Sequence, residues 1–523
     1  MKSVMKKSFS RVPHADISRS SFDRSSGVKT TFDGGYLVPF FADEALPGDT
    51  FNLRTSGFAR MATPLHPIMD NLYMDTFYFS VPLRLLWTNF VKMMGEQTDP
   101  SDSVDYSVPT SFSPASGGYT LGSLQDYLGL PTEIETLEHS ALFTRAYNLI
   151  WNEWFRDQNL QDSVTVDTGD GPDTVANYVL LKRGKRHDYF TSCLPWPQKG
   201  TAVDLPLGTS APIIGDGTIM QLSPTSASTT PEDVSTTNLE GLKISTYGTQ
   251  AYIPDDGSFG ATADLSGATA ATINQLRQAF QVQVMYERDA RGGTRYAELI
   301  RSHFNVTDPM SAVLQRPEYL GGGSTPVNVH PVAATNDDAT NVSVGQLGAF
   351  GTAAFQHHGF TKSFTEHSII IGLVNVRADL TYQQGLNRMW SREDKLDFYW
   401  PALSGLGEQA VLNKEIYAQG SAAPVQDGNV FGYQERFAEY RYKPSTIHGL
   451  FRSNATGTLD SWHLSQEFAS LPVLGDTFIQ DSPPIDRVVA TPSEPDFIAD
   501  FHHQLICARP MPMYGVPSSL GRF

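Results

Sequence analysis

Alternation of apolar and polar residues predicts β-strands towards both ends of the chain. In residues 71–82, the odd-numbered positions from Tyr73 to Val81 are mostly aromatic or apolar, which is the period of a half-buried strand. Residues 501–515 alternate in a similar way. Residues 367–382 are rich in β-branched side chains, which favour a pleated sheet. The sequence therefore predicts a sheet built from segments that are far apart in the chain.

Helical periodicity occupies parts of the chain between these strands. Residues 83–95, 137–157 and 272–293 carry apolar side chains three and four positions apart, which predicts amphipathic helices. Residues 321–345 are rich in Gly, Asn and Thr, and we expect a surface loop there. Strands at both ends, with helices and long loops between them, predict one β-sandwich that carries large insertions.

One stretch differs in texture from the rest of the chain. In residues 201–270, twenty of the 70 residues are Ser or Thr, and eight acidic residues face a single Lys. Periodicity is weak there and turn-forming residues are frequent. We interpret this segment as a surface insertion that lies outside the main core.

Composition narrows the class of protein. The chain has 523 residues, only 18% of them charged, with 43 Gly and 33 Pro, which suits a loop-rich β protein. The net charge of −18 argues against a sequence-specific DNA-binding protein, so contact with a polyanion must be local. Cys193 and Cys507 form neither metal-ligand spacing nor a disulfide framework, and we expect free thiols in a reducing compartment. No apolar stretch resembles a signal peptide or a membrane span, so we expect a soluble protein.

A local positive charge lies at the N-terminus. Residues 1–31 carry seven Lys or Arg against two Asp, and they predict a basic arm. Two interpretations remain open, a solvated tail and an arm that touches nucleic acid. The candidate nucleic-acid-binding residues are Lys2, Lys6, Lys7, Arg11, Arg19 and Arg24.

Motifs for catalysis, metals and cofactors are absent or weak in the sequence. It contains no P-loop, HExxH, GxSxG or dinucleotide-binding fingerprint. The His pairs at 357–358 and 502–503 are adjacent, and neighbours in a strand point to opposite faces, so neither pair suits a shared metal. Glu435 and Glu439 have the spacing of a carboxylate pair, but Arg436 and nearby cations lower carboxylate pKa values and oppose a general acid. We therefore expect neither an enzyme, a bound metal nor a cofactor.

Two segments combine aromatic residues with balanced charge. Residues 286–304 and 431–453 are rich in Arg and Tyr and poor in Lys, a composition typical of interfaces between subunits. The candidate interface residues are Arg288, Arg291, Arg295, Tyr433, Arg436, Phe437, Tyr440 and Arg441.

The same segments carry a family resemblance. Residues 285–309, 314–323, 365–386 and 431–453 together resemble the major capsid protein of microviruses, in the gokushovirus branch. The resemblance runs from about residue 32 to the end and is weakest in residues 201–270 and 326–346.

The resemblance implies more than the residues do. It implies an eight-stranded antiparallel viral jelly roll over residues 32–523, with long loop insertions containing short helices, and an interior arm over residues 1–31. It implies a T=1 icosahedral shell, with pentamer intermediates, that packages the circular single-stranded DNA of a bacteriophage. Residues 201–270 become the candidate three-fold protrusion, with host attachment as a further step.

The implied partners are other copies of the chain, the genome, a viral scaffolding protein, a DNA-pilot protein, a small DNA-binding protein and a bacterial surface receptor, without membrane insertion. Assembly is expected in the host bacterial cytoplasm. Two alternatives stay open at this point: a carbohydrate-binding or carbohydrate-active β-sandwich, and a soluble nucleic-acid binder.

Overall fold

The computed structural model describes residues 18–200, 273–307, 315–335 and 344–515, together with four short strands between residues 213 and 263. Those strands are β8 (Ile213–Gly215), β9 (Gln221–Leu222), β10 (Glu232–Asp233) and β11 (Ala261–Ala263). The chain divides into two compact units. The first joins Met1–Pro197 with Gly292–Phe523, and the second is Gln198–Arg291. The second unit holds these short strands and all but the last residue of helix α5 (Ile273–Gly292), and its range includes the insertion predicted at residues 201–270.

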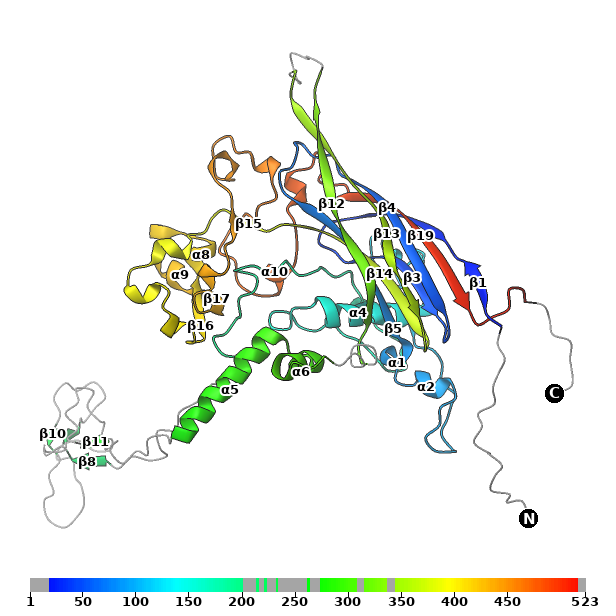
Figure 1. Ribbon diagram of the computed structural model, residues 1–523, viewed down its shortest axis with the longest axis horizontal. Coiled ribbons are helices and arrows are strands. Elements are labelled where there is room, and N and C mark those ends of the chain that lie inside the picture. The colour runs from blue at the N-terminus through cyan, green and yellow to red at the C-terminus, as the bar shows by residue number, and fades with distance from the viewer. Residues whose placement is uncertain are drawn as a thin grey trace, which may run out of the picture. The chain divides into compact units, whose positions relative to one another are not determined.

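Within the described residues, nine strands of the first unit form one continuous sheet that folds into two layers (Figure 1). The strands are β1 (Ser20–Asp23), β2 (Ser26–Phe32), β3 (Val38–Ala45), β4 (Thr50–Met61), β5 (Leu72–Pro82), β12 (Glu318–Ala333), β13 (Leu347–Ser363), β14 (Ser368–Ala378) and β19 (Phe497–Arg509). One layer has the order β2-β19-β4-β13 and the other has the order β3-β14-β5-β12. All neighbouring strands in these layers are antiparallel.

This connectivity is that of a jelly roll. Strands β2, β3, β4 and β5 alternate between the layers, and β12, β13, β14 and β19 do so again on the return. Eight strands in two interlocked Greek keys define the fold, so the predicted architecture is confirmed. β1 adds to the far end of β19, where Ser20 lies opposite Arg509.

Aromatic residues from both layers fill the space between them. The rings of Phe40 and Phe501, from opposite layers, lie 4.8 Å apart. A chain of hydrogen bonds crosses the same core. The Tyr78 hydroxyl lies 2.5 Å from Thr55 Oγ1, and Thr55 Oγ1 lies 3.0 Å from His503 Nδ1. His503 Nε2 donates to the carbonyl oxygen of Phe40 over 3.0 Å. Burial lowers the pKa of His503 to about 4, so the ring is neutral near pH 7.

Helices from the connection between β5 and β12 cover the outer face of one layer. Helices α1 (Leu83–Leu86), α2 (Phe90–Met93) and α4 (Leu142–Ile150) pack on β5 and β14 through one apolar cluster. A π-helical turn, Trp151–Phe155, continues α4. The helix predicted at residues 137–157 is therefore shorter than expected, because residues 138–140 pair as a strand with residues 110–112. The helix predicted at residues 83–95 divides into α1 and α2, whereas the helix predicted at residues 272–293 is confirmed as α5.

The loop predicted at residues 321–345 is wrong for its first half, which is strand. β12 contains Gly321, Gly322 and Gly323, and side chains there would collide with the neighbouring strands. A Cβ on Gly322, where φ is +156°, would lie 2.0 Å from the carbonyl oxygen of Thr76. Glycine in a strand marks a close backbone approach or a bulge, and here the register shifts between Tyr319 and Gly321. The three glycines are therefore a feature of the strand and do not signal a loop.

The remaining elements lie mainly in the long connections that leave and rejoin the sheets. The connection between β14 and β19 builds a third apolar cluster together with residues 189–193. The elements not yet named are α3 (Leu124–Tyr127), α6 (Tyr296–Phe304), α8 (Asn413–Ile416), α9 (Pro424–Gly428), α10 (Asp476–Ile479), β6 (Thr110–Phe112), β7 (Glu138–Ser140), β15 (Thr381–Tyr382), β16 (Glu408–Leu412), β17 (Val430–Glu435) and β18 (Ser445–Thr446).

Candidate subunit interface and nucleic-acid contacts

The segment 431–453 is anchored by the hairpin of β16 and β17. Tyr433 lies opposite Ala410 and exchanges two backbone hydrogen bonds of 2.8 Å with Leu194. After the hairpin, Phe437 adopts a left-handed backbone conformation (φ 63°) and is 3% exposed. Its ring packs 5.2 Å from that of Tyr399. Tyr433 and Phe437, both candidate interface residues, thus help to hold this subunit together.

Both glutamates of the segment are engaged by cations of the same chain. Arg441 forms an ion pair with Glu435. The Glu439 carboxylate lies 3.6 Å from the Arg392 guanidinium and accepts a 2.7 Å hydrogen bond from Gln409. The two glutamates are therefore structural charges.

A group of exposed aromatic side chains surrounds this segment. Trp390 is 72% exposed, Phe398 is 50% exposed and Tyr440 is 51% exposed. The guanidinium of Arg392 lies 4.4 Å from the Tyr440 ring and 5.4 Å from the Phe398 ring, which ties the group together. We call this surface the aromatic patch, and it consists of Met389, Trp390, Phe398, Tyr399, Trp400, Tyr440 and Tyr442. Exposed apolar surface of this kind, rich in Trp, Tyr and Arg, is typical of a protein–protein contact.

A cavity of about 350 Å³ opens beside the aromatic patch, between Trp390 and Tyr442. Glu415 lines it and is held by the Tyr189 hydroxyl at 2.8 Å and by Arg388 Nη1 at 3.1 Å. Burial raises the pKa of Glu415, while the hydrogen bonds and Arg388 act in the opposite direction. The carboxylate is already satisfied, so the cavity offers shape and aromatic surface rather than a free catalytic group.

The other candidate interface residues lie on two different units. Arg288 and Arg291 are exposed on α5 of the second unit. Arg295 belongs to the first unit, where it precedes α6 and pairs with Glu153 at 3.3 Å and Glu298 at 3.1 Å. Arg436 donates to the carbonyl oxygen of Leu396 over 3.0 Å. The structure thus gives Arg295 and Arg436 contacts within one subunit, and their role between subunits stays a prediction.

The described part of the basic arm lies on the sheet. Arg19 donates to the carbonyl oxygen of Gly48 over 2.6 Å, and Arg24 pairs with Asp43 at 2.5 Å. Residues 20–23 and 26–32 are strands β1 and β2. The other four candidates, Lys2, Lys6, Lys7 and Arg11, lie outside the described residues. Nucleic-acid binding by these six residues stays a prediction.

Further cations, which the sequence pattern alone did not single out, lie on the outer face of the layer β2-β19-β4-β13. Arg54 and Arg60 are exposed on β4, and no ion pair joins either of them to another described residue. Phe58 stands between them, 45% exposed, and its ring lies 5.9 Å from the Arg60 guanidinium. Alternation in residues 50–61, with two Arg six positions apart on the polar side, was the signal that could have revealed this face.

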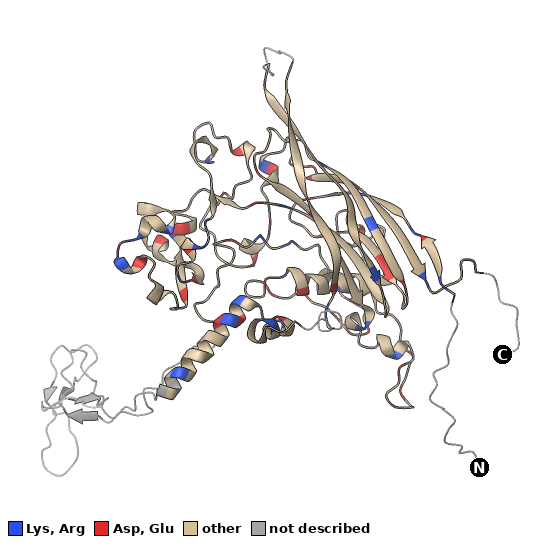
Figure 2. Ribbon diagram, in the orientation of Figure 1, with Lys and Arg blue, Asp and Glu red and all other residues tan. Residues whose placement is uncertain are grey.

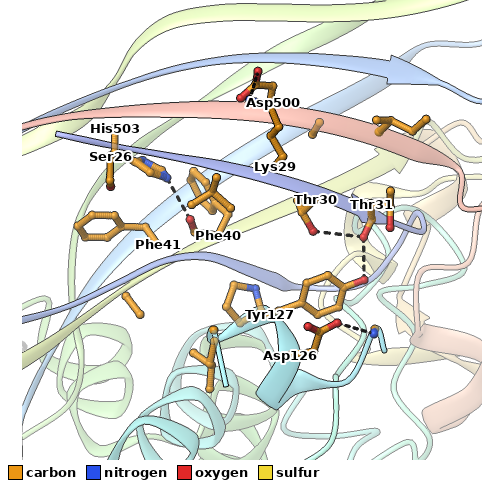
Figure 3. A pocket seen from close by; sticks show the side chains of 18 of the residues that line it. Ser26, Lys29, Thr30, Thr31, Phe40, Phe41, Asp126, Tyr127, Asp500 and His503 are labelled. Carbon is orange, nitrogen blue, oxygen red and sulfur yellow. Dashed lines mark hydrogen bonds and ion pairs between the residues drawn. The ribbon is translucent and has the colours of Figure 1, made fainter. Parts of the chain in front are cut away.

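A cleft of about 970 Å³ separates the edge strands β2 and β3 of the two layers (Figure 3). Several of its polar side chains are already paired within the subunit. Lys29 binds Asp500 at 2.9 Å, and the Tyr127 hydroxyl donates to the carbonyl oxygen of Thr31 over 2.9 Å. Asp126 accepts from the Gly122 amide over 2.8 Å. These paired side chains are therefore not available as the convergent unpaired groups that catalysis would need.

Histidine and cysteine positions match the strand geometry. His502 is exposed and His503 is buried, so the two rings point to opposite faces of β19. Cys193 and Cys507 are both buried, and neither forms a disulfide. Over the described ranges, no group of three or more His, Cys, Asp or Glu is arranged to hold a metal ion. No helix in the described part of the chain is both long enough and apolar enough to cross a bilayer.

Comparison with known proteins decides between the remaining classes. The family model described as "Capsid protein (F protein)" matches residues 10–519. The chain belongs to this phage capsid protein family. It is 49% identical to capsid protein VP1 of Bdellovibrio phage phiMH2K, over 99% of this chain and 98% of that protein. It is 44% identical to capsid protein VP1 of Chlamydia phage 1 and 35% identical to that of Spiroplasma virus 4, each over at least 97% of both chains.

Family membership confirms the predicted resemblance to the gokushovirus major capsid protein. The chain is a structural protein of a phage virion, a capsid protein and not an enzyme, and its family assembles into a shell. The carbohydrate-active alternative and the soluble nucleic-acid binder are therefore set aside. The described residues form a jelly roll, and the aromatic patch is an exposed apolar surface beside segment 431–453.

Proposed function

We propose that this capsid protein builds a T=1 icosahedral shell, through pentamer intermediates, around a circular single-stranded DNA genome. The observation that carries the proposal is a complete jelly roll in a chain that is related over its whole length to three phage capsid proteins. Electron microscopy of the expressed protein, with its viral scaffolding partner present, should show small closed shells or pentamers. A protein that stays monomeric under these conditions would contradict the proposal.

We place one subunit contact at the aromatic patch and segment 431–453. Trp390→Ala and Arg441→Ala should each reduce the yield of shells at least tenfold, because exposed Trp, Tyr and Arg side chains dominate binding energy at interfaces. Both side chains are more than half exposed, so the isolated subunit should unfold at an unchanged denaturant concentration. Leu121→Ala, at a residue 76% exposed and on a different segment, is the matched control. Normal shell yields from both patch variants would refute this proposed contact.

We place genome contacts on the N-terminal arm and on the outer face that carries Arg54 and Arg60. Cations attract phosphates, and an exposed aromatic ring such as Phe58 offers a platform for an unpaired base. Deleting residues 1–17, which spares strands β1 and β2, should weaken binding of a single-stranded oligonucleotide. Arg54→Gln with Arg60→Gln should weaken it further, and the slope of log K against log salt should fall by about 0.7 for each phosphate that is no longer neutralised. Unchanged affinity and slope in both variants would refute these contacts.

We further propose that residues 201–270 form a protrusion at the three-fold axes and contribute to attachment to a bacterial surface receptor. Their composition, eight acidic residues and twenty Ser or Thr among 70, suits a solvated surface element. Replacing them with a short Gly-Ser linker should leave shells intact, remove three-fold density and reduce adsorption to host cells. The viral DNA-pilot and small DNA-binding proteins are further expected partners, and assembly is expected in the bacterial cytoplasm.

A further inference from the structure

The two strands β12 and β13 extend beyond the sandwich as a ribbon. Pairing of β12 with β5 ends at Val327, and pairing of β13 with β4 begins at Thr352. Between these points, residues 328–333 pair with residues 347–352, and the described residues provide no third strand there. We call this element the ribbon. Figure 1 shows it projecting past the ends of the other strands.

The ribbon carries no acidic residue, Lys or Arg, and most of its side chains are apolar or small. The sequence contains no Lys, Arg, Asp or Glu from residue 319 to residue 334, or from residue 344 to residue 361. Figure 2 shows the ribbon without a charged residue, whereas charges of both signs are present on the layers below it. Phe350 is 48% exposed, Val332 is 50% exposed and Leu347 is 36% exposed.

Both faces of the ribbon share this character. The register places His330 and Phe350 opposite each other on one face, where their rings lie 5.2 Å apart. Val332 follows on that face, because side chains two positions apart share a face of a strand. The other face carries Pro331 and Leu347 towards the tip, whereas nearer the base Ala349 is 6% exposed and Val329 packs against the core of the same subunit. The base of the ribbon thus lies on its own subunit, while its outer part exposes apolar side chains on both faces, and these are available to a neighbour on each side.

The outer part of the ribbon, which lacks this support, is costly to expose to water. A two-stranded hairpin is at best marginally stable alone, and exposed strands are normally protected by charged side chains. Within the described residues, this part of the ribbon has neither a third strand beside it nor charged side chains. Pro331 has no amide hydrogen, which disfavours strand-to-strand extension at its position. The faces of the ribbon, rather than its edges, are therefore the surfaces suited to contact.

We propose that the ribbon is an assembly element that packs between the ribbons of two adjacent copies of this chain around a symmetry axis. In a closed ring, each subunit presents one face to the copy before it and the opposite face to the copy after it. Because both exposed faces are uncharged and largely apolar, identical copies can pack one face against the other. The occupant is a copy of the same chain because the family assembles into a shell, which provides such copies. This contact is distinct from the aromatic patch and involves no residue of it.

The test compares two double variants of the full chain. Val332→Asp with Phe350→Asp places like charges where adjacent ribbons would meet, and it should lower the yield of closed shells at least tenfold. Val332→Thr with Phe350→Tyr keeps the shape without charge and should assemble at nearly the yield of the unmodified chain. Circular dichroism and the unfolding midpoint of the isolated subunit should be unchanged in both, because these side chains are already half exposed.

Amide hydrogen exchange provides a second readout that does not depend on the variants. Peptides covering residues 328–333 and 347–352 should exchange at least tenfold more slowly in purified shells than in unassembled subunits. Shells formed at normal yield by the Asp variant would overturn the proposal, and so would equal exchange in shells and subunits. Protection that appears only on adding scaffolding protein, host cells or lipid vesicles to subunits would also overturn it, in favour of that partner. Failure of the unmodified chain to form shells would instead refute the shell proposal itself.

Discussion

The two layers of the jelly roll differ in what covers their outer faces. β14 lies in the layer covered by helices, and all but one of its residues are buried. β19 lies in the other layer, and from Phe497 to Cys507 its residues alternate strictly between buried and exposed. The covered strand reads as a continuous apolar run, whereas the open strand alternates. One sheet layer is thus packed on both faces, by the other layer and by the helices. The second layer is packed only on its inner face, and its outer face is exposed.

The largest loss of stability should come from breaking a buried ion pair within the helical cover. Arg145 of α4 is fully buried and binds Asp173 through two hydrogen bonds of 2.7 and 2.5 Å. Removing one member leaves an unpaired buried charge, so Arg145→Ala should lower the free energy of unfolding by about 3–5 kcal/mol. Denaturant unfolding of the isolated subunit measures this. A decrease below about 1 kcal/mol would show that the helical cover contributes little to stability.

The next largest difference in stability should appear when an apolar side chain is truncated in each layer. Ile371 of β14 is fully buried and packs in the cluster beneath α4, and Ile371→Ala should cost about 2–5 kcal/mol. Ile498 of β19 is 63% exposed, and Ile498→Ala should cost less than about 0.5 kcal/mol. Similar destabilisation by the two variants, measured as shifts in unfolding midpoint, would contradict the contrast between covered and open layers.

The pH dependence of stability should distinguish the two faces of β19 itself. Burial lowers the pKa of His503 to about 4 from an unfolded value near 6.5, so the unfolded chain binds the proton first as pH falls. The stability that the folded state gains from keeping His503 neutral is fully present above pH 6.5, and it is lost as pH falls from 6.5 through about 4. It amounts to about 3 kcal/mol, since each pKa unit corresponds to roughly 1.4 kcal/mol.

Between pH 7 and pH 4, the free energy of unfolding should therefore depend less steeply on pH in His503→Gln than in the unmodified chain. His502→Gln changes a residue on the exposed face and should leave the slope as it is. Equal slopes in all three proteins would show that His503 is not held neutral by the core.

The smallest effect should come from an ion pair on the open layer. Lys29 pairs with Asp500 at 2.9 Å, but their side chains are 80% and 54% exposed. Exposed pairs of this kind contribute at most about 1 kcal/mol, and salt screens them. Lys29→Ala should thus shift the unfolding midpoint slightly at low salt and not at about 0.5 M salt. A large shift that persists at high salt would mean that the open layer is more tightly built than its exposure suggests.

Much of the fold could be predicted from the sequence because one-sided burial leaves an alternating pattern. Residues 71–82 and 501–515 show this pattern, and they fall largely in β5 and β19. The run at residues 367–382 was identified through β-branched residues, since β14 is buried on both faces and alternates little. The glycines at 321–323 misled the prediction, because a turn and a close approach of strands demand the same residue.

The candidate interface was predicted less completely. The charge and aromatic content of residues 431–453 indicated a contact region, yet Tyr433 and Phe437 are largely used within the subunit. The exposed rings of Trp390 and Phe398 were missed, because a sequence does not show which aromatic residues of a loop remain outside the core. Arg19 and Arg24 looked like parts of a free arm, but their partners Gly48 and Asp43 become neighbours only when β1 and β2 join the sheet.

The pairing of β1 with β19 has a practical consequence for rearranging the chain. Ser20 and Arg509 face each other across one strand spacing, about 5 Å, although 489 positions separate them in the sequence. A linker of a few residues could therefore join these two points, and new ends could be opened elsewhere, for example at the exposed residue Val473. Such a circular permutant would keep every strand of the jelly roll while moving the site at which a foreign peptide can be fused.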